Sequence, residues 1–196
     1  MKVKTATFEK VDTKILTLPN ILSFLRICMI PFIVWFYCVK EEFGIAGCIL
    51  ILSGITDVVD GFIARHFNMV SDFGKALDPI ADKLTQGVML ICLIFRFPLM
   101  IVPLIVLSLK ESFMIVTNFL VIQKTGVVPG ANWHGKVATA LLYSMMILHT
   151  FWFEIPKHVS NILIYACAVM IALSFLLYGK KNINTLERKN DNEEKD

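Results

Sequence analysis

Long apolar stretches separated by short polar connections run through most of the chain. Six of them are long enough to cross the hydrocarbon core of a bilayer, which is about 30 Å thick and requires about 20 apolar residues per helix. They cover residues 21–39, 44–65, 76–95, 99–123, 136–153 and 159–178. The pattern therefore predicts an all-α integral membrane protein with six transmembrane helices.

The two ends of the chain are polar and are predicted to lie outside the membrane. Residues 1–18 hold four lysines and no apolar run, so we expect a cytoplasmic arm with a short interfacial helix rather than a cleaved signal peptide. Residues 19–179 form the predicted six-helix domain. Residues 180–196 are rich in Lys, Asn and Glu, which predicts a disordered cytoplasmic tail.

Composition agrees with a membrane protein and suggests its orientation. Hydrophobic residues make up 56% of the chain and charged residues only 18%, with a mean hydropathy of +0.68. Most of the 19 Lys and Arg residues lie in the N-terminal arm, the second and fourth connections and the tail. By the positive-inside rule, both termini are predicted to face the cytoplasm. The net charge of +3 then indicates attraction to anionic lipid headgroups and gives no reason to expect nucleic-acid binding.

A polar motif with regular spacing interrupts the apolar sequence between residues 57 and 82. It reads D-x2-D-G-x2-A-R-x8-G-x3-D-x3-D. On the second predicted helix Asp57 and Asp60 share one face, and on the third Asp78 and Asp82 are one turn apart. The short connection between the two helices makes them antiparallel neighbours, which brings the two acidic pairs opposite each other. Pro79 is predicted to lie in the first turn of the third helix.

Four carboxylates close to lipid would repel one another and would be poorly solvated. Divalent cations remove this cost, and oxygen ligands favour Mg²⁺ or Mn²⁺. Two such cations can bind a diphosphate and offset charge in phosphoryl transfer. The motif therefore predicts a cation-dependent enzyme that acts on phosphate at the cytoplasmic ends of the two helices.

The other residues of the motif fit a phosphate ligand, although each has a structural alternative. Gly61, Ala64 and Gly74 lack bulk, so a ligand can approach the backbone, but small residues also serve helix packing. Arg65 lies beside the acidic cluster and is interpreted as a phosphate contact, the alternative being a side chain that extends to the membrane interface.

All eight positions of this motif resemble the signature of the CDP-alcohol phosphotransferases, also called CDP-alcohol phosphatidyltransferases. Leu18-Pro19-Asn20 and Leu25-Arg26-Ile27 resemble the start of the family's first helix. Residues 74–83 are similar to the bacterial phosphatidylglycerophosphate synthases and to the related cardiolipin synthases. The resemblance covers about residues 15–180.

The resemblance implies a homodimer of six-helix subunits in a bacterial plasma membrane. Its members move the phosphatidyl group of CDP-diacylglycerol to an alcohol and release CMP. The family's roles imply that Asp57, Asp60 and Asp78 ligate metal, and that Asp82 is both a ligand and the general base. They also imply a CDP pocket lined by Asp57, Gly61, Ala64 and Gly74, with Arg65 as a further donor contact.

The acceptor alcohol is expected to contact Lys110 in the fourth helix and Lys136 in the fifth, because an intramembrane lysine usually marks a site. Glu111 is not expected to pair with Lys110, because adjacent helix positions do not face each other. Glycerol 3-phosphate is the favoured acceptor. Relatives resembling this chain carry two more cations, where Asn118 and Ala138 stand here. The singly charged phosphatidylglycerol, the acceptor of a cardiolipin synthase, is therefore the alternative.

Two further interpretations complete the predictions. A divalent-cation transporter would need acidic ligands that continue across the membrane, but residues 44–54 and 84–94 contain none, so an enzyme is favoured. His134 is interpreted as a solvated or interfacial residue rather than as a base.

Overall fold

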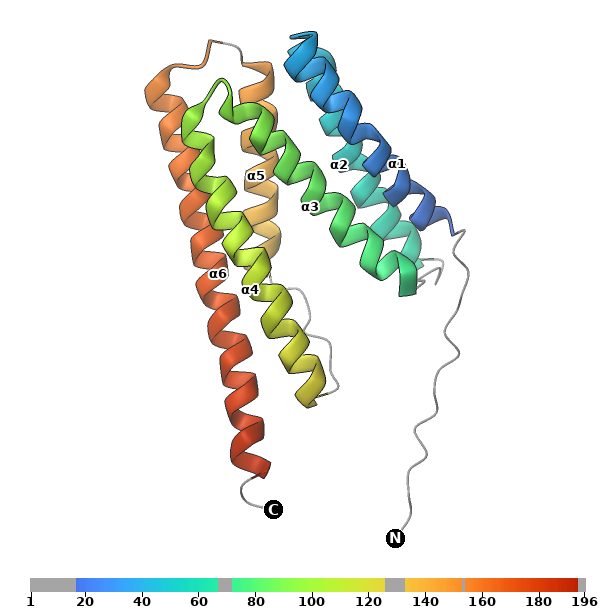
Figure 1. The fold of residues 1–196 in the computed structure, drawn as a ribbon, viewed down its shortest axis with the longest axis vertical. Helices are drawn as coiled ribbons and strands as arrows, with labels where there is room; N and C mark the ends of the chain where they lie inside the picture. The colour runs from blue at the N-terminus through green and yellow to red at the C-terminus, as the bar shows by residue number, and fades with distance from the viewer. Residues whose placement is uncertain (1–16, 67–71, 126–132, 153, 194–196) are drawn as a thin grey trace. The chain divides into compact units, whose positions relative to one another are not determined.

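The computed structural model describes residues 17–66, 72–125, 133–152 and 154–193, and this part of the chain is helical. Six long helices and two short helical segments follow one another (Figure 1). Their bounds are α1 Leu18–Val34, η1 Trp35–Val39, α2 Phe43–His66, α3 Asp72–Ile94, η2 Pro98–Met100, α4 Ile101–Thr125, α5 Trp133–Phe151 and α6 Lys157–Glu193. Each predicted apolar stretch corresponds to one long helix.

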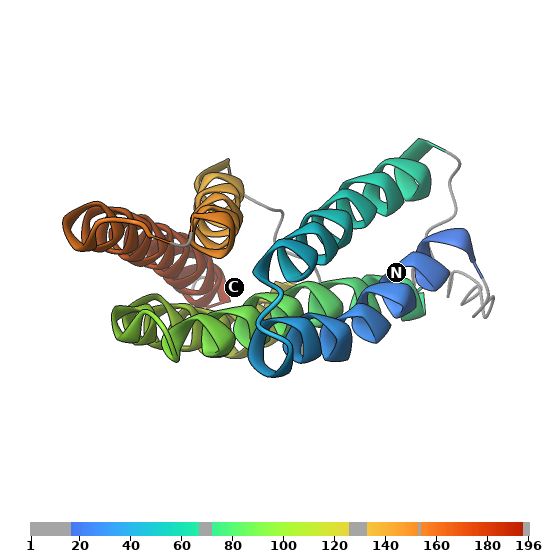
Figure 2. The same cartoon turned by 90° about the horizontal axis from the view of Figure 1, so that it is seen from above.

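The first compact unit extends to Met89 and contains α1, η1, α2 and most of α3. Helix α1 carries Pro19 in its first turn, where a proline lacks no helical hydrogen bond. Pro31 lies inside α1, and four residues later the helix continues as the π-helical segment η1. Three residues then connect η1 to α2, so that α1 and α2 pack side by side in Figures 1 and 2.

The second compact unit begins at Leu90 and contains η2, α4, α5 and α6. Helix α6 packs against both α4 and α5. The core of this second unit contains fully buried apolar side chains of α5 and α6: Leu142, Met146, Ile164 and Ile171. These positions follow a helical spacing on each helix, which places them on one face.

Two helix boundaries differ from the sequence predictions. Helix α3 begins at Asp72, so Pro79 lies inside the helix and not in its first turn. Helix α6 continues to Glu193, whereas composition predicted disorder from residue 180. Lys, Glu and Arg favour helix once a preceding turn exists, because each further residue adds one hydrogen bond to a helix already formed. The predicted interfacial helix in residues 1–18 lies almost wholly outside the described residues.

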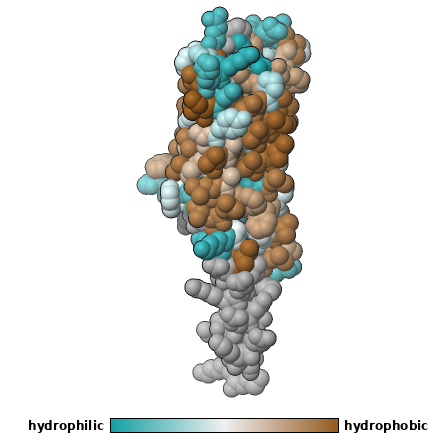
Figure 3. Space-filling view, turned by 90° about the vertical axis from the view of Figure 1, so that its left-hand side faces the viewer, coloured by the Kyte–Doolittle hydropathy of each residue, from teal (hydrophilic) through white to brown (hydrophobic). Residues whose placement is uncertain are grey.

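Within the described ranges, four helical stretches are long and apolar enough to cross a membrane: Leu18–Val39, Phe43–Ile63, Pro98–Gln123 and Lys157–Ile183. Their outer faces expose large apolar side chains, among them Phe24, Ile115 and Leu176 at 61%, 70% and 68%. Figure 3 shows one face on which apolar side chains cover most of the coloured surface. Such surfaces are stable in lipid and not in water, so the protein is a membrane protein.

Candidate metal centre

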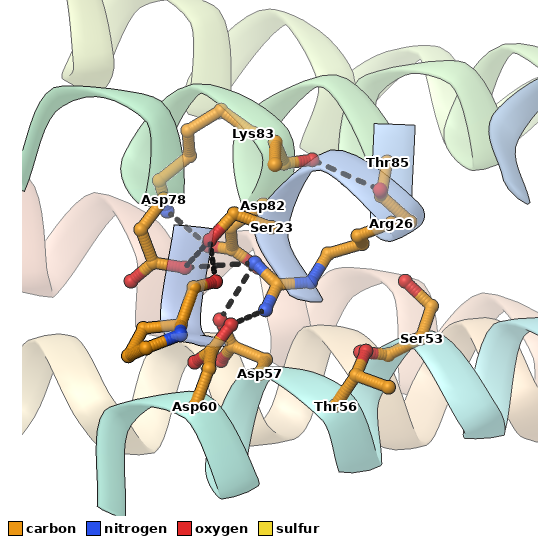
Figure 4. A network of polar contacts seen from close by, with 12 residues as sticks. Ser23, Arg26, Ser53, Thr56, Asp57, Asp60, Asp78, Asp82, Lys83 and Thr85 are labelled. Carbon is orange, nitrogen blue, oxygen red and sulfur yellow. Dashed lines mark hydrogen bonds and ion pairs between the residues drawn. The ribbon is translucent and has the colours of Figure 1, made fainter. Parts of the chain in front are cut away.

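An arginine from the first helix contacts the aspartates of the motif. Nη1 of Arg26 lies 3.0 Å from Oδ1 of Asp57 and 2.9 Å from Oδ1 of Asp78, and Nη2 lies 2.5 Å from Oδ2 of Asp60. Figure 4 shows this guanidinium, carried by α1, between the two aspartates of α2 and Asp78 of α3. One side chain therefore links the three helices of the first unit.

Helical spacing explains how α1 presents this arginine. Ser23, Arg26 and Ile33 are buried on α1 and Tyr37 is buried on η1, while Phe24 and Phe32 are exposed on α1. The buried positions are three, seven and four residues apart, which places them on one helical face that points into the unit and carries the arginine with it. The hydroxyl of Ser23 donates to the backbone oxygen of Pro19 at 3.1 Å and lies 3.5 Å from Oδ1 of Asp78.

The three aspartates form a group of carboxylates that could hold a metal ion. Asp57, Asp60 and Asp78 each offer one oxygen, and these oxygens lie within 4.8 Å of one another. Asp60 is buried, and its Oδ1 has no hydrogen bond from any described side chain. A buried carboxylate oxygen of this kind needs a proton donor or a cation. Oxygen donors suit hard cations such as Mg²⁺, so the residues present fit the divalent cation that the motif predicts.

Asp82 lies one turn further along α3, next to the three clustered aspartates in Figure 4. It is outside the group of three described above. Its Oδ2 accepts a hydrogen bond of 2.8 Å from Nε2 of Gln86 and lies 3.4 Å from Nζ of Lys83. The oxygen of the Gln86 amide in turn lies 3.4 Å from the same ammonium. Because Gln86 is fully buried, it holds the Asp82 carboxylate in a fixed orientation.

The small residues of the motif lie where the sequence placed them, but their proposed contacts with a ligand remain predictions. Gly61 follows Asp60 on α2 and is half-buried, and Gly74 is half-buried in the first turn of α3. Ala64 and Arg65 belong to the last turn of α2, and their side chains lie outside the described set.

The predicted acceptor residues belong to the second unit. Lys110 is buried on α4, and its Nζ lies 2.8 Å from Oε1 of Glu111. The expectation that these neighbours do not pair is wrong. Both side chains are long enough to turn toward each other along the helix surface, and an ion pair lowers the cost of placing a charge in this apolar segment. Lys136 is exposed in the first turns of α5.

His134 was interpreted as solvated or interfacial rather than as a base, and the part of this interpretation that placed it in solvent is wrong. Its ring is buried, with Nδ1 3.1 Å from Oγ of Ser174 and the ring centroid 4.6 Å from that of Tyr178. Gly135 makes the approach of α5 to α6 close at this point, because a Cβ there would lie 2.9 Å from Oη of Tyr178. These side chains pack the start of α5 against α6.

Sequence reasoning missed the contribution of two polar residues to the site. Arg26 was recognised only as part of a motif in the first helix, although an arginine within an apolar helix predicts a buried acidic partner. Gln86 gave a weaker signal: it lies four residues after Asp82, on the same helix face.

Comparisons with known proteins agree with the motif. A family model described as CDP-alcohol phosphatidyltransferase matches residues 16–177. A Bacillus subtilis (strain 168) protein named CDP-diacylglycerol--glycerol-3-phosphate 3-phosphatidyltransferase is 31% identical over 191 residues, which cover 88% of this chain and 98% of the relative.

Two further relatives carry the two names that the motif suggests, one name each. A Rickettsia bellii protein with the same name as the Bacillus relative is 36% identical over 113 residues, covering 56% of this chain and 62% of its own. A Streptomyces coelicolor protein named cardiolipin synthase (CMP-forming) is 34% identical over 142 residues, covering 69% of this chain and 66% of its own. The chain therefore belongs to the CDP-alcohol phosphatidyltransferase family and is a transferase.

Proposed function

We propose that this protein transfers the phosphatidyl group of CDP-diacylglycerol to glycerol 3-phosphate, giving phosphatidylglycerophosphate and CMP. The observation that carries the proposal is the group of three carboxylates from two helices, within 4.8 Å of one another, in a chain of this family. The Bacillus relative, which this chain matches over nearly its full length, carries the name of that activity.

Asp57, Asp60 and Asp78 hold divalent cations in this proposal, two ions of Mg²⁺ or Mn²⁺ with Asp82 as a further ligand. When bound, the cations neutralise the diphosphate of the donor and the charge that develops during transfer. Gly61, Ala64 and Gly74 leave space for the cytidine diphosphate beside the aspartates. Arg65 supplies a positive charge to the phosphates.

Asp82 is the proposed general base. The hydroxyl oxygen of the acceptor attacks the phosphorus of the phosphatidyl group, the bond from that phosphorus to the oxygen of CMP breaks, and the hydroxyl proton moves to the Asp82 carboxylate. The hydrogen bond from Gln86 at 2.8 Å supports this role, because it orients the carboxylate without neutralising its charge. CMP leaves with the bridging oxygen.

An assay with purified protein tests the proposal directly. The protein is incubated with CDP-diacylglycerol, Mg²⁺ or Mn²⁺, and either glycerol 3-phosphate or phosphatidylglycerol, and the lipid products are identified by mass spectrometry. We expect phosphatidylglycerophosphate and CMP, formed only with the divalent cation. Cardiolipin formed from phosphatidylglycerol alone would make the protein a cardiolipin synthase, and no product from either acceptor would contradict both assignments.

Cardiolipin synthase remains the second candidate because of a specific contact in the second unit. Nδ2 of Asn182 donates hydrogen bonds of 3.0 Å to Oγ1 of Thr117 and 2.9 Å to Oδ1 of Asn118. A neutral amide held in this way provides no cation for a phosphate dianion. A phosphodiester acceptor requires less positive charge.

Replacing Lys110 tests the acceptor site. If Lys110 binds the acceptor phosphate, Lys110→Ala lowers kcat/KM for the acceptor by roughly tenfold or more, because a charge-assisted hydrogen bond contributes about 1.5–3 kcal/mol. The KM for CDP-diacylglycerol stays nearly constant. Lys110→Arg, which keeps the charge, and Lys40→Ala, which removes an exposed lysine, are the controls. Equal losses for donor and acceptor would assign Lys110 to folding instead of acceptor binding.

We also propose that α3 and α5 cross the membrane, which gives six spans, a cytoplasmic active site and cytoplasmic termini in the plasma membrane. Helix α3 has no charged residue beyond Lys83, and α5 has 19 residues, close to the length that a bilayer requires. The family resemblance supports a homodimer.

Cysteine labelling tests this topology. In a background without the five native cysteines, a cysteine at exposed position 66, before α3, or 133, at the start of α5, is expected to react with a membrane-impermeant maleimide only from the cytoplasmic side. A cysteine at exposed position 95, after α3, or 154, after α5, is expected to react only from the opposite side. The same sidedness for positions 66 and 95 would refute the span of α3, and the same sidedness for positions 133 and 154 would refute the span of α5.

A further inference from the structure

Arg26 has a position that a merely structural arginine would not need. Its side chain is fully buried, and both terminal nitrogens point at the candidate metal ligands. Nη1 is shared between Asp57 and Asp78, which belong to different helices, while its Nε has no hydrogen-bond partner among the described residues. The guanidinium thus contacts the carboxylates through its two terminal nitrogens, Nη1 and Nη2.

Arg26 and the three aspartates that it contacts carry more negative than positive formal charge. Three carboxylates and one guanidinium carry a net charge of −2, and Asp82 lies beside the ammonium of Lys83. One divalent cation balances this charge. A second would leave excess positive charge beside the buried side chains of Arg26 and Asp60, which is costly unless an anion arrives with it. The diphosphate of the donor is such an anion.

We propose that Arg26 makes the binding of the second divalent cation depend on the nucleotide donor. The inference rests on the proposed function, because it requires a diphosphate donor and a cation site at the aspartates. In the absence of donor, Arg26 supplies the positive charge that a second cation would otherwise supply. The enzyme then binds the second cation only together with CDP-diacylglycerol, so the cation centre is completed by the substrate.

Neutral and charged substitutions of Arg26 have opposite expected effects. Arg26→Gln raises the negative charge of the group, so the second cation binds without donor and at least tenfold more tightly than in the wild type, a coupling of ordinary size. Arg26→Lys keeps the charge and keeps the dependence on donor. Arg96→Gln makes the same chemical change at the turn before η2 and leaves cation binding unchanged.

The test is a titration of the full chain in lipid nanodiscs with Mn²⁺, read by electron paramagnetic resonance of free Mn²⁺. It is performed with and without CDP-diacylglycerol in the disc, and the acceptor is omitted. Wild type is expected to bind one Mn²⁺ without donor and two with donor, whereas Arg26→Gln is expected to bind two in both conditions. A single Mn²⁺ bound by Arg26→Gln without donor, or two bound by wild type without donor, would overturn the proposal.

A second measurement covers the case in which Arg26→Gln is unstable. Arg26→Met keeps the apolar length of the side chain, and the rise of the thermal unfolding midpoint with Mn²⁺ concentration reports binding to the folded state. The neutral variants are expected to be stabilised by Mn²⁺ more than wild type is. Equal stabilisation would contradict the role of Arg26. Failure of the wild type to bind Mn²⁺ in any condition would instead refute the proposed cation site itself.

Discussion

Asp82→Asn is expected to retain the helical fold and to lose CMP release by roughly 10²–10⁴-fold, the usual contribution of a general base. An amide cannot accept the proton of the acceptor hydroxyl, and it is a weaker ligand than a carboxylate. The hydrogen bond from Gln86 can be kept, because the amide oxygen of asparagine also accepts. The folded structure should therefore change little.

The measurement is CMP release at saturating CDP-diacylglycerol, together with circular dichroism and thermal unfolding of each variant. Glu42→Gln makes the same carboxylate-to-amide change at an exposed position between η1 and α2 and serves as the control. It is expected to have wild-type activity. Near-normal turnover by Asp82→Asn would exclude this residue as the base, and the assignment of the reaction would then have to rest on another acceptor of the proton.

The positions of the helices could be predicted because a bilayer imposes a length on each apolar segment. The predicted segment 99–123 lies within the helical stretch formed by η2 and α4, and segment 136–153 begins three residues after the first residue of α5. The polar ends were harder to predict. Backbone hydrogen bonds continue beyond the apolar part of a helix, so hydropathy gave neither the start of α3 at Asp72 nor the extension of α6 to Glu193.

The site was predictable to the extent that it depends on spacing within a helix. The motif predicted that Asp57 and Asp60 come together with Asp78 and Asp82. The structure confirms this grouping for Asp57, Asp60 and Asp78, whereas Asp82 lies outside the group. The contact with Arg26 depends on how α1 packs, and its partners lie 31 to 52 positions away in the sequence, so no local pattern identifies which aspartates they are. The Lys110–Glu111 pair shows the opposite error, since a rule about backbone positions underestimated the reach of two long side chains.

Asp60→Asn is expected to reduce both activity and stability, in contrast to Asp82→Asn. Asp60 has a side chain only 2% exposed and contacts Nη2 of Arg26 at 2.5 Å. The substitution leaves the buried guanidinium with one charged partner fewer, and the loss of a charged hydrogen bond costs about 2 kcal/mol of unfolding free energy. It also removes a carboxylate from the proposed cation site, so we expect turnover to fall at least as far as in Asp82→Asn.

Asp57→Asn is the matched control for the stability effect, because it removes the same group from the same helix and contacts the same arginine. The side chain of Asp57 is 36% exposed, so solvent screens its ion pair and the expected loss of stability is well below that of Asp60→Asn. Thermal unfolding in the presence of a chelator separates the ion pair from any bound cation, and CMP release measures the catalytic loss. Activity should be lost in both variants, while stability is lost mainly in Asp60→Asn. Equal destabilisation of the two proteins would show that the burial of Asp60 against Arg26 does not determine the strength of this contact.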